Sequence, residues 1–277
     1  MKTETDKSVI RNSFREQAAL TQLHRWIAFC LAEDAPSERI ADLLGEQSKL
    51  IIGEDTVAEG PAEMIQLARS TGISAIISPD VAVVGDLGGD FGMRAVGRST
   101  TGTRAFQQIT FTFDWTDCLE PLLHTISYSE PGGEKPVIEP IEPMASRLLS
   151  VSHRWHVLVE DPERTPEPFQ EIISEDFVME YGHGAVRSYD ELVDWVTGSA
   201  SSVGASRHDL VGLKCERLGP GVHRAEFVLD WNGLTHDGKN MTAQTRHTWR
   251  IRDVPAARFP VIEHIDVEFL QPFKVIE

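Results

Sequence analysis

The residues best suited to acid–base chemistry are a histidine and a glutamate on two neighbouring predicted strands near the C-terminal end of the chain. Strict alternation places His247 on the apolar face of residues 241–252 and Glu263 on the apolar face of residues 261–270. A buried carboxylate is costly unless it is paired, and a hairpin that pairs Trp249 with Glu263 makes His247 its nearest partner. A paired, partly desolvated histidine has a pKa suited to proton transfer near neutral pH. The pair therefore predicts a general acid–base site. The alternatives are a structural ion pair and a flared strand end that leaves Glu263 in solvent.

A tyrosine and a second histidine complete the predicted catalytic set. Tyr181 ends a predicted strand at residues 176–182, and His208 begins another at residues 207–217. Alternation puts His208 on the opposite face from Val211, so only a bulge would turn it inward. The substrate-binding residues expected around this set are Phe227, Leu229, Trp231, Trp249 and Glu160.

The elements that must position these residues are predicted from the period of the apolar side chains. Residues 144–159 have helical spacing, and Ser188 opens a capping box for a second helix. After these helices the period changes to two, which predicts an antiparallel meander and an α+β unit. The four strands are expected near residues 207–217, 222–231, 241–252 and 261–270.

The same plan occurs earlier in the chain. A His-Arg-Trp phrase opens a helical stretch at residues 24–26 and again at residues 153–155. The first copy continues with strands predicted near residues 75–84, 90–99, 104–115 and 120–129. Its third strand carries Ile109 and Phe111 where the second copy carries His247. We therefore expect the chemistry to reside in the second copy and the first copy to act mainly as a scaffold.

A proline-rich segment separates the two copies. Prolines at residues 131, 136, 140 and 143 exclude a continuous helix or a central strand there. We predict a first domain at residues 1–130, a linker at residues 131–143 and a second domain at residues 144–277. Because so many prolines make the linker stiff, the two copies are expected to form an internal pseudo-dimer, with a homo-oligomer as a further option.

Composition bounds the partners and the compartment. Of the 277 residues, 41% are apolar and 25% are charged, as in a globular protein, and the net charge of −17 would repel a nucleic acid. The polar start has no signal peptide, no apolar run approaches about 18 residues, and the three cysteines are scattered. We therefore expect a cytoplasmic protein that contacts neither nucleic acid nor membrane.

No cofactor is expected either. The chain has no P-loop, dinucleotide fingerprint or HExxH motif, and the five histidines between residues 208 and 264 lie on different predicted strands. Neither a metal nor a nucleotide is therefore predicted. The expected partner is a small apolar organic ligand.

Both copies resemble the NTF2-like superfamily. Its cone-shaped α+β unit has N-terminal helices packed on a curved antiparallel sheet, and the resemblance implies two such domains in tandem. The second copy is similar to the SnoaL-like and scytalone-dehydratase-like branch over most of its length. The matching segments are Arg154–Trp155, Met179–Tyr181, Arg207–Asp209 and Trp249–Ile251.

This resemblance implies roles for particular residues. In that branch a tyrosine at the position of Tyr181 and a histidine at the position of His208 belong to the active-site pocket. A carboxylate late in helix one, near Glu160 here, partners a histidine on the second long strand. This sequence has Leu229 or Asp230 at that place, so the resemblance leaves Glu160 without its histidine.

Three functions remain open from the sequence. The first is an acid–base isomerase, cyclase or dehydratase that acts on a small apolar, carbonyl-bearing or polycyclic molecule. The second is a module that binds a small molecule or supports assembly without chemistry. The third is an epoxide hydrolase, which needs two acids in one pocket. Glu160 with Glu180 or Glu263 would supply them.

Overall fold

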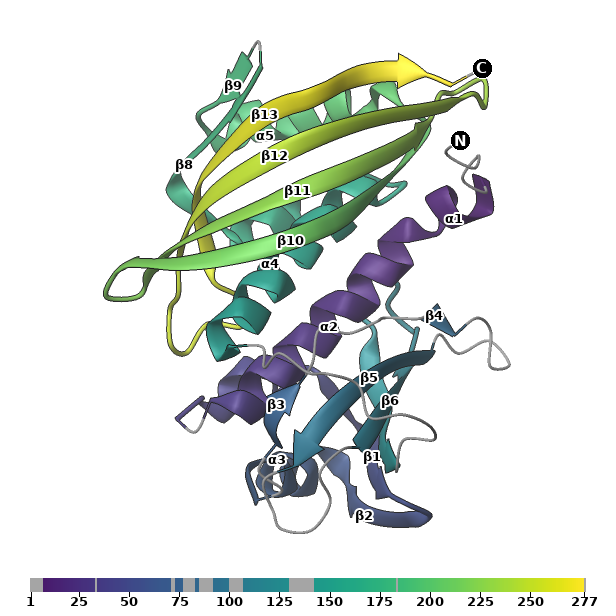
Figure 1. Ribbon diagram of the computed structural model, residues 1–277, viewed down its shortest axis with the longest axis vertical. Helices are drawn as coiled ribbons and strands as arrows, with labels where there is room; N and C mark the ends of the chain where they lie inside the picture. Colours follow the sequence, from purple (N-terminus) through teal and green to yellow (C-terminus); the bar gives the residue numbers. More distant parts are fainter. Residues whose placement is uncertain are drawn as a thin grey trace. The chain divides into compact units, whose positions relative to one another are not determined.

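The computed structural model describes residues 7–32, 34–70, 73–76, 83–84, 92–99, 107–129, 142–182 and 184–276 (Figure 1). The chain divides into two compact units. The C-terminal unit holds the described residues of Met1–Gln17, Val151–Val254 and Phe259–Glu277. The N-terminal unit holds those of Ala18–Ser150 and Pro255–Arg258. The predicted linker lies almost wholly outside the described residues, and the predicted domain boundaries remain predictions.

The C-terminal unit is built on a six-stranded sheet in the order β10-β11-β12-β13-β8-β9. The four long strands are antiparallel neighbours, and alternate residues along β11 are buried, as the period of two predicted. β8 runs parallel to β13, and β9 forms a hairpin with β8. The strand bounds are β8 Ile173–Tyr181, β9 Gly184–Val186, β10 Ala205–Gly219, β11 Val222–Leu234, β12 Asn240–Arg252 and β13 Val261–Val275.

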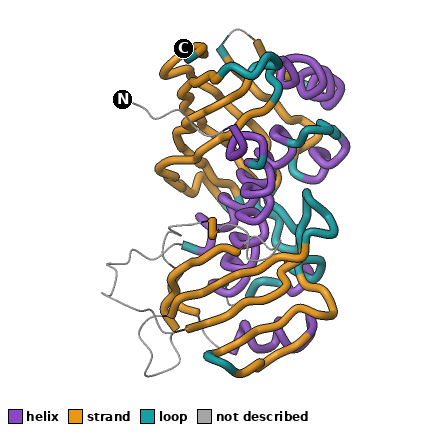
Figure 2. Tube along the Cα trace, turned by 90° about the vertical axis from the view of Figure 1, so that its right-hand side faces the viewer, coloured by secondary structure: helices purple, strands orange, loops and turns teal. Residues whose placement is uncertain are grey.

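Helices cover one face of this sheet (Figures 1 and 2). They include the long α4 and the short α5. α5 begins at the predicted capping box, where the Ser188 hydroxyl accepts from the Glu191 backbone N–H at 3.2 Å. None of the described helices is long and apolar enough to cross a membrane. The bounds are α1 Lys7–Arg11, α2 Ser13–Leu31, α4 Pro143–Glu160, η2 Glu167–Glu171, α5 Tyr189–Asp194, η3 Trp195–Ser199 and η4 Ala200–Ser202.

The N-terminal unit repeats this topology. Its sheet has the order β2-β1-β7-β6-β5-β3, with β4 also paired to β5. The β1–β2 hairpin and the parallel β1–β7 pair correspond to the β8–β9 hairpin and the parallel β8–β13 pair. The matching strand orders confirm the internal repeat seen in the sequence. The bounds are β1 Leu44–Ile52, β2 Asp55–Glu59, β3 Ile73–Ile76, β4 Val83–Val84, β5 Gly92–Ser99, β6 Gln107–Asp114 and β7 Leu122–Ser129, with η1 Ser37–Arg39 and α3 Gly60–Ser70 before β3.

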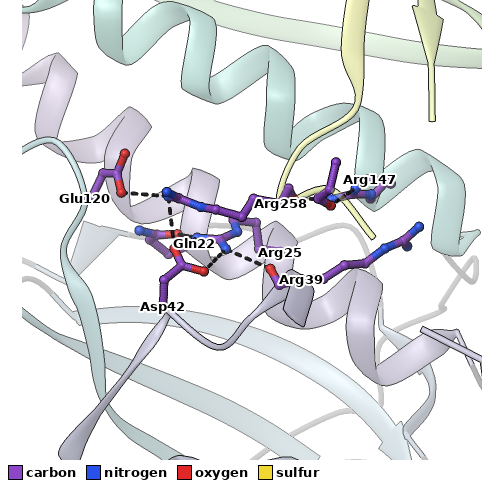
Figure 3. Close-up of polar contacts among 8 residues, drawn as sticks. Gln22, Arg25, Arg39, Asp42, Glu120, Arg147 and Arg258 are labelled. Carbon is purple, nitrogen blue, oxygen red and sulfur yellow. Dashed lines mark hydrogen bonds and ion pairs between the residues drawn. The ribbon is translucent and has the colours of Figure 1, made fainter. Parts of the chain in front are cut away.

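A cluster of charged side chains stabilises the N-terminal unit (Figure 3). Arg25, only 2% exposed, contacts both carboxylate oxygens of Asp42 at 2.6 and 3.0 Å. Arg258 contacts Asp42 at 2.9 Å and Glu120 at 2.6 Å. Arg147 donates to the backbone carbonyls of Ala257 and Arg258. Burial acts to raise the pKa of Asp42, but the hydrogen bond and charge of Arg25 and the charge of Arg258 outweigh it and lower that pKa. Asp42 is therefore ionised at neutral pH, and its carboxylate is fixed in place by the two arginines.

The tryptophan of the second His-Arg-Trp phrase is the centre of an aromatic cluster. Trp155 is 4% exposed, and its ring centroid lies 5.0 Å from that of Phe169, 5.8 Å from Phe177 and 6.0 Å from Trp249. We expect Trp155→Ala to lower the free energy of unfolding by about 3–5 kcal/mol, because it removes a large buried ring from a packed core. Urea denaturation would measure this. Val254→Ala removes an exposed side chain and serves as the control, and equal losses for the two variants would contradict the expectation.

Candidate active site

The C-terminal unit encloses a cavity of about 560 Å³. Most of its wall is hydrocarbon or aromatic, with a few polar groups among the apolar ones, which is the usual make-up of a small-molecule site. The wall residues come from α4, from the segment after α5 and from five strands of the sheet. They are Trp155, His156, Val159, Met179, Tyr181, Trp195, Ala200, Ser202, Val203, Ser206, His208, Leu229, Trp231, Met241, Thr245, His247, Ile265, Val267, Phe269 and Phe273.

The strongest polar arrangement at this cavity joins the end of α4 to the start of β10. Oε1 of Glu160 accepts from the backbone N–H of His208 at 2.9 Å and lies 2.9 Å from Nδ1 of the same residue. The Glu160 side chain is 1% exposed. Burial raises its pKa, and the hydrogen bond and charge of His208 oppose that rise. Because Nδ1 faces the carboxylate, Nε2 is the ring nitrogen left for a ligand.

A strand bulge explains why His208 faces inward. His208 is paired with Trp231 across β10 and β11, so the two side chains share the cavity face. The register shifts between Val211 and Lys214, where Gly212 has a φ of +68°. Val211 is 51% exposed, so it faces away from the cavity. Before the bulge, His208 therefore faces inward and Val211 outward, the reverse of what continuous alternation predicts. The bulge that the sequence required for an inward His208 is therefore present.

Residues from the beginning of the chain hold the start of β10. Nε2 of Gln17 donates to the His208 carbonyl at 2.7 Å, and Oε1 of Gln17 lies 2.7 Å from Nδ1 of His153. Arg207, the neighbour of His208, contacts both carboxylate oxygens of Glu16 at 2.5 and 3.2 Å. These partners are 191 residues from β10 in the chain. The first residues of α2 thus complete the site in the C-terminal unit.

His247 also lines the cavity, but its partners differ from the prediction. Its Nδ1 accepts from the indole N–H of Trp249 at 3.2 Å, and its Nε2 lies 3.0 Å from the Thr245 hydroxyl. The Phe227 ring stacks on the imidazole with centroids 5.4 Å apart. Burial, with a smaller contribution from the charge of His208, lowers the pKa of His247 to about 3. The imidazole is therefore neutral at neutral pH.

The predicted pairing of His247 with Glu263 is wrong. The Glu263 carboxylate accepts instead from Arg250 and Arg252, at 2.8 Å in each case. Arg250 is paired with His264 and Ile251 with Ile262, so Glu263 is the extra residue of a bulge in β13. The bulge buries Ile262 and Ile265 and turns Glu263 away from the cavity wall, where arginines satisfy its charge.

A third histidine at the cavity, His156, is absent from the predicted set. Its ring stacks on that of His208 with centroids 4.8 Å apart. Burial, followed by the charges of the neighbouring histidines, lowers the pKa of His156 well below its ordinary value. The available signal is its spacing, because His156 and Glu160 are four residues apart on one helix face. The resemblance gave a site role on this helix to Glu160 and none to His156.

The other predicted residues divide between the wall and the layer behind it. Tyr181, Leu229 and Trp231 line the cavity. Phe227 and Trp249 are 2% and 0% exposed and lie behind the wall, where they support His247. The Trp231 ring lies over Gly233, where an added Cβ would come within 2.1 Å of it, so only glycine leaves room for this ring position. Among the described residues, no group of three or more histidine, cysteine or acidic side chains is arranged to hold a metal ion.

Comparison with known proteins gives matches of fold only. No family model matches the chain, and no curated protein matches it significantly. A hexachlorocyclohexane dehydrochlorinase, LinA-type3, from Novosphingobium barchaimii LL02 is 10% identical over 48% of this chain and 90% of its own, with a TM-score of 0.42. A candidate scytalone dehydratase from Novosphingobium aromaticivorans is 8% identical over 47% and 86%, with a TM-score of 0.41.

An NTF2-like superfamily protein from Salmonella enterica is 13% identical over 43% of this chain and 85% of its own, with a TM-score of 0.38. Each of these structures therefore matches about half of this chain and most of its own length. The chain itself has a mixed α+β fold with two sheets, each packed with helices, as the sequence predicted.

Proposed function

We propose that the protein is an acid–base enzyme, an isomerase, cyclase or dehydratase, that acts on a small apolar molecule with a carbonyl group or several rings. The observation that carries the proposal is that His208, which lines an apolar cavity, is paired with the buried carboxylate of Glu160. His208 would take a proton from the carbon beside the carbonyl, and the electron pair of the broken C–H bond would pass into an enolate. The proton would then return from Nε2 to another carbon or to a leaving hydroxyl group.

The surroundings of the pair support this division of roles. Glu160 accepts from Nδ1, so it orients the imidazole and balances the positive charge that forms on His208 when the proton arrives. His156 and His247 do not compete for that proton, because burial lowers the pKa of each. Leu229, Val159 and Met179 exclude water from the space beside them. His208 is thus the histidine at the cavity that is best placed to accept a proton.

Epoxide opening by paired carboxylates is less well supported. It needs a second acid beside Glu160 in one cavity. Of the two candidates from the sequence, Glu180 is 52% exposed and Glu263 is bound by arginines. Neither of them lines the cavity wall. An acid–base enzyme, in contrast, needs only the Glu160–His208 pair.

The test is hydrogen exchange into a panel of bicyclic to tetracyclic ketones, of which 1-tetralone is the smallest. The protein is incubated with each ketone in D₂O, and NMR follows loss of the signal of the hydrogens beside the carbonyl. We expect at least one ketone to exchange much faster than in protein-free buffer. Binding of the ketones without any acceleration would instead identify a binding module.

A further inference from the structure

Three side chains of β12 form one directed hydrogen-bond chain that ends at the cavity. The indole Nε1–H of Trp249 donates to Nδ1 of His247 at 3.2 Å, and Nε2 of His247 lies 3.0 Å from Oγ1 of Thr245. Trp249 is fully buried, whereas His247 and Thr245 both line the cavity. The three residues alternate along one strand, so they share its inner face.

The chemistry of the groups fixes the direction of this chain. An indole nitrogen only donates, so Nδ1 of His247 must be the unprotonated acceptor. The imidazole is neutral, because burial lowers its pKa to about 3, and its single proton therefore lies on Nε2. Nε2–H then donates to the Thr245 hydroxyl oxygen. Both hydrogen-bonding positions of the imidazole are thus used.

The hydroxyl hydrogen of Thr245, at the end of these hydrogen bonds, has no acceptor within the three residues. The Thr245 oxygen accepts from His247, so its own O–H must find another acceptor. Within the described part of the chain, Thr245 has no other hydrogen-bond partner. Its side chain lies at the cavity wall, at a residue that is 7% exposed. A ligand that displaces water from the cavity must therefore supply the acceptor, because a buried hydroxyl without a partner costs free energy.

We propose that Thr245 is a hydrogen-bond donor of fixed direction that selects ligands with an acceptor oxygen, above all ketones, over hydrocarbons of the same shape. The proposal rests on the same cavity as the proposed function. Trp249 and His247 are positioning residues, and Thr245 is the residue that touches the ligand. Since an enolate oxygen accepts more strongly than a ketone oxygen, the same donor would also stabilise an enolate.

The test compares 9-fluorenone with fluorene, which differ only by a carbonyl in place of a methylene group. Fluorenone has no hydrogen on the carbons beside its carbonyl, so it cannot form an enolate, and the result does not depend on catalysis. Calorimetry or fluorescence would measure both dissociation constants. We expect Thr245→Val to weaken fluorenone binding about 3- to 10-fold and to leave fluorene binding unchanged. Thr245→Ser keeps the hydroxyl and should restore the preference for fluorenone.

The direction of the Trp249–His247–Thr245 hydrogen bonds can be tested without a ligand. Nitrogen NMR of ¹⁵N-histidine-labelled protein, with His247 assigned by its loss in His247→Leu, should show a neutral ring protonated at Nε2. Trp249→Phe should disturb this signal and reduce the preference for fluorenone, although Thr245 is intact. A ring protonated at Nδ1 would overturn the proposal. So would fluorenone that binds no more tightly than fluorene to the wild type, or equal losses of both probes in Thr245→Val.

Discussion

His208→Gln is expected to slow exchange of the hydrogens beside the ketone carbonyl by about 10²- to 10⁴-fold, the range typical of a lost general acid or base. Glutamine fills similar space and can still donate toward Glu160, which lies 2.9 Å from the histidine ring nitrogen. It cannot accept a proton at neutral pH. The dissociation constant of the ketone should therefore change far less than the turnover rate, and exchange rates followed by NMR at saturating ketone would show it.

Two control variants make this comparison specific. His236→Gln makes the same change at an exposed histidine on the turn before β12, and it should leave exchange unchanged. Glu263→Gln tests the pair that the sequence favoured, and its effect should be small because its carboxylate contacts Arg250 and Arg252 rather than the cavity. A larger loss in Glu263→Gln than in His208→Gln would show that the wrong residue has been assigned.

The second large effect is acid destabilisation of the C-terminal unit. Burial lowers the pKa of His153 and of His247 to about 3, and it lowers that of His156 well below the ordinary value. In the unfolded chain each of these imidazoles has a pKa of about 6.5. Unfolding therefore takes up protons between about pH 6.5 and pH 3. The stability that the neutral rings confer is present above about pH 6.5 and is lost as the pH falls through that window.

Each of the three imidazoles should contribute up to about 1.4 kcal/mol per pH unit inside the window. Glu160 opposes them, since burial raises the pKa of its carboxyl and its protonation favours the folded state as the pH falls. Urea denaturation between pH 7.5 and pH 5 would give the slope of the unfolding free energy. The slope reports the number of protons taken up on unfolding. His247→Gln should lower that number by up to about one, whereas His236→Gln should leave it unchanged. A slope that none of the buried histidines changes would refute this account of acid sensitivity.

Local patterns were sufficient to predict most of the fold. The period of two in β11 and β12 and the capping box at Ser188 depend on neighbours in the sequence, and the structure has them as predicted. The short β9 strand and its hairpin with β8 were not predicted. Three residues give too little periodicity to distinguish a strand from a loop.

The candidate site was harder to predict because it depends on two bulges and on distant contacts. One extra residue in β13 turned Glu263 out, and one irregularity in β10 turned His208 in. The irregularity in β10 makes His208 the partner of Glu160. The resemblance placed that partner on the second long strand instead. Gln17 reaches His208 from 191 residues away. No local pattern in a single sequence reports such a contact.

The most direct test of the central claim is a crystal structure of the protein with 1-tetralone bound. The account predicts that the ketone lies in the cavity, with the carbon beside its carbonyl about 3–3.5 Å from Nε2 of His208, the separation of reacting groups in a productive complex. Its carbonyl oxygen would accept from Thr245. A ketone bound outside the cavity, or bound inside it with that carbon turned away from His208, would contradict the assignment of His208 as the proton acceptor.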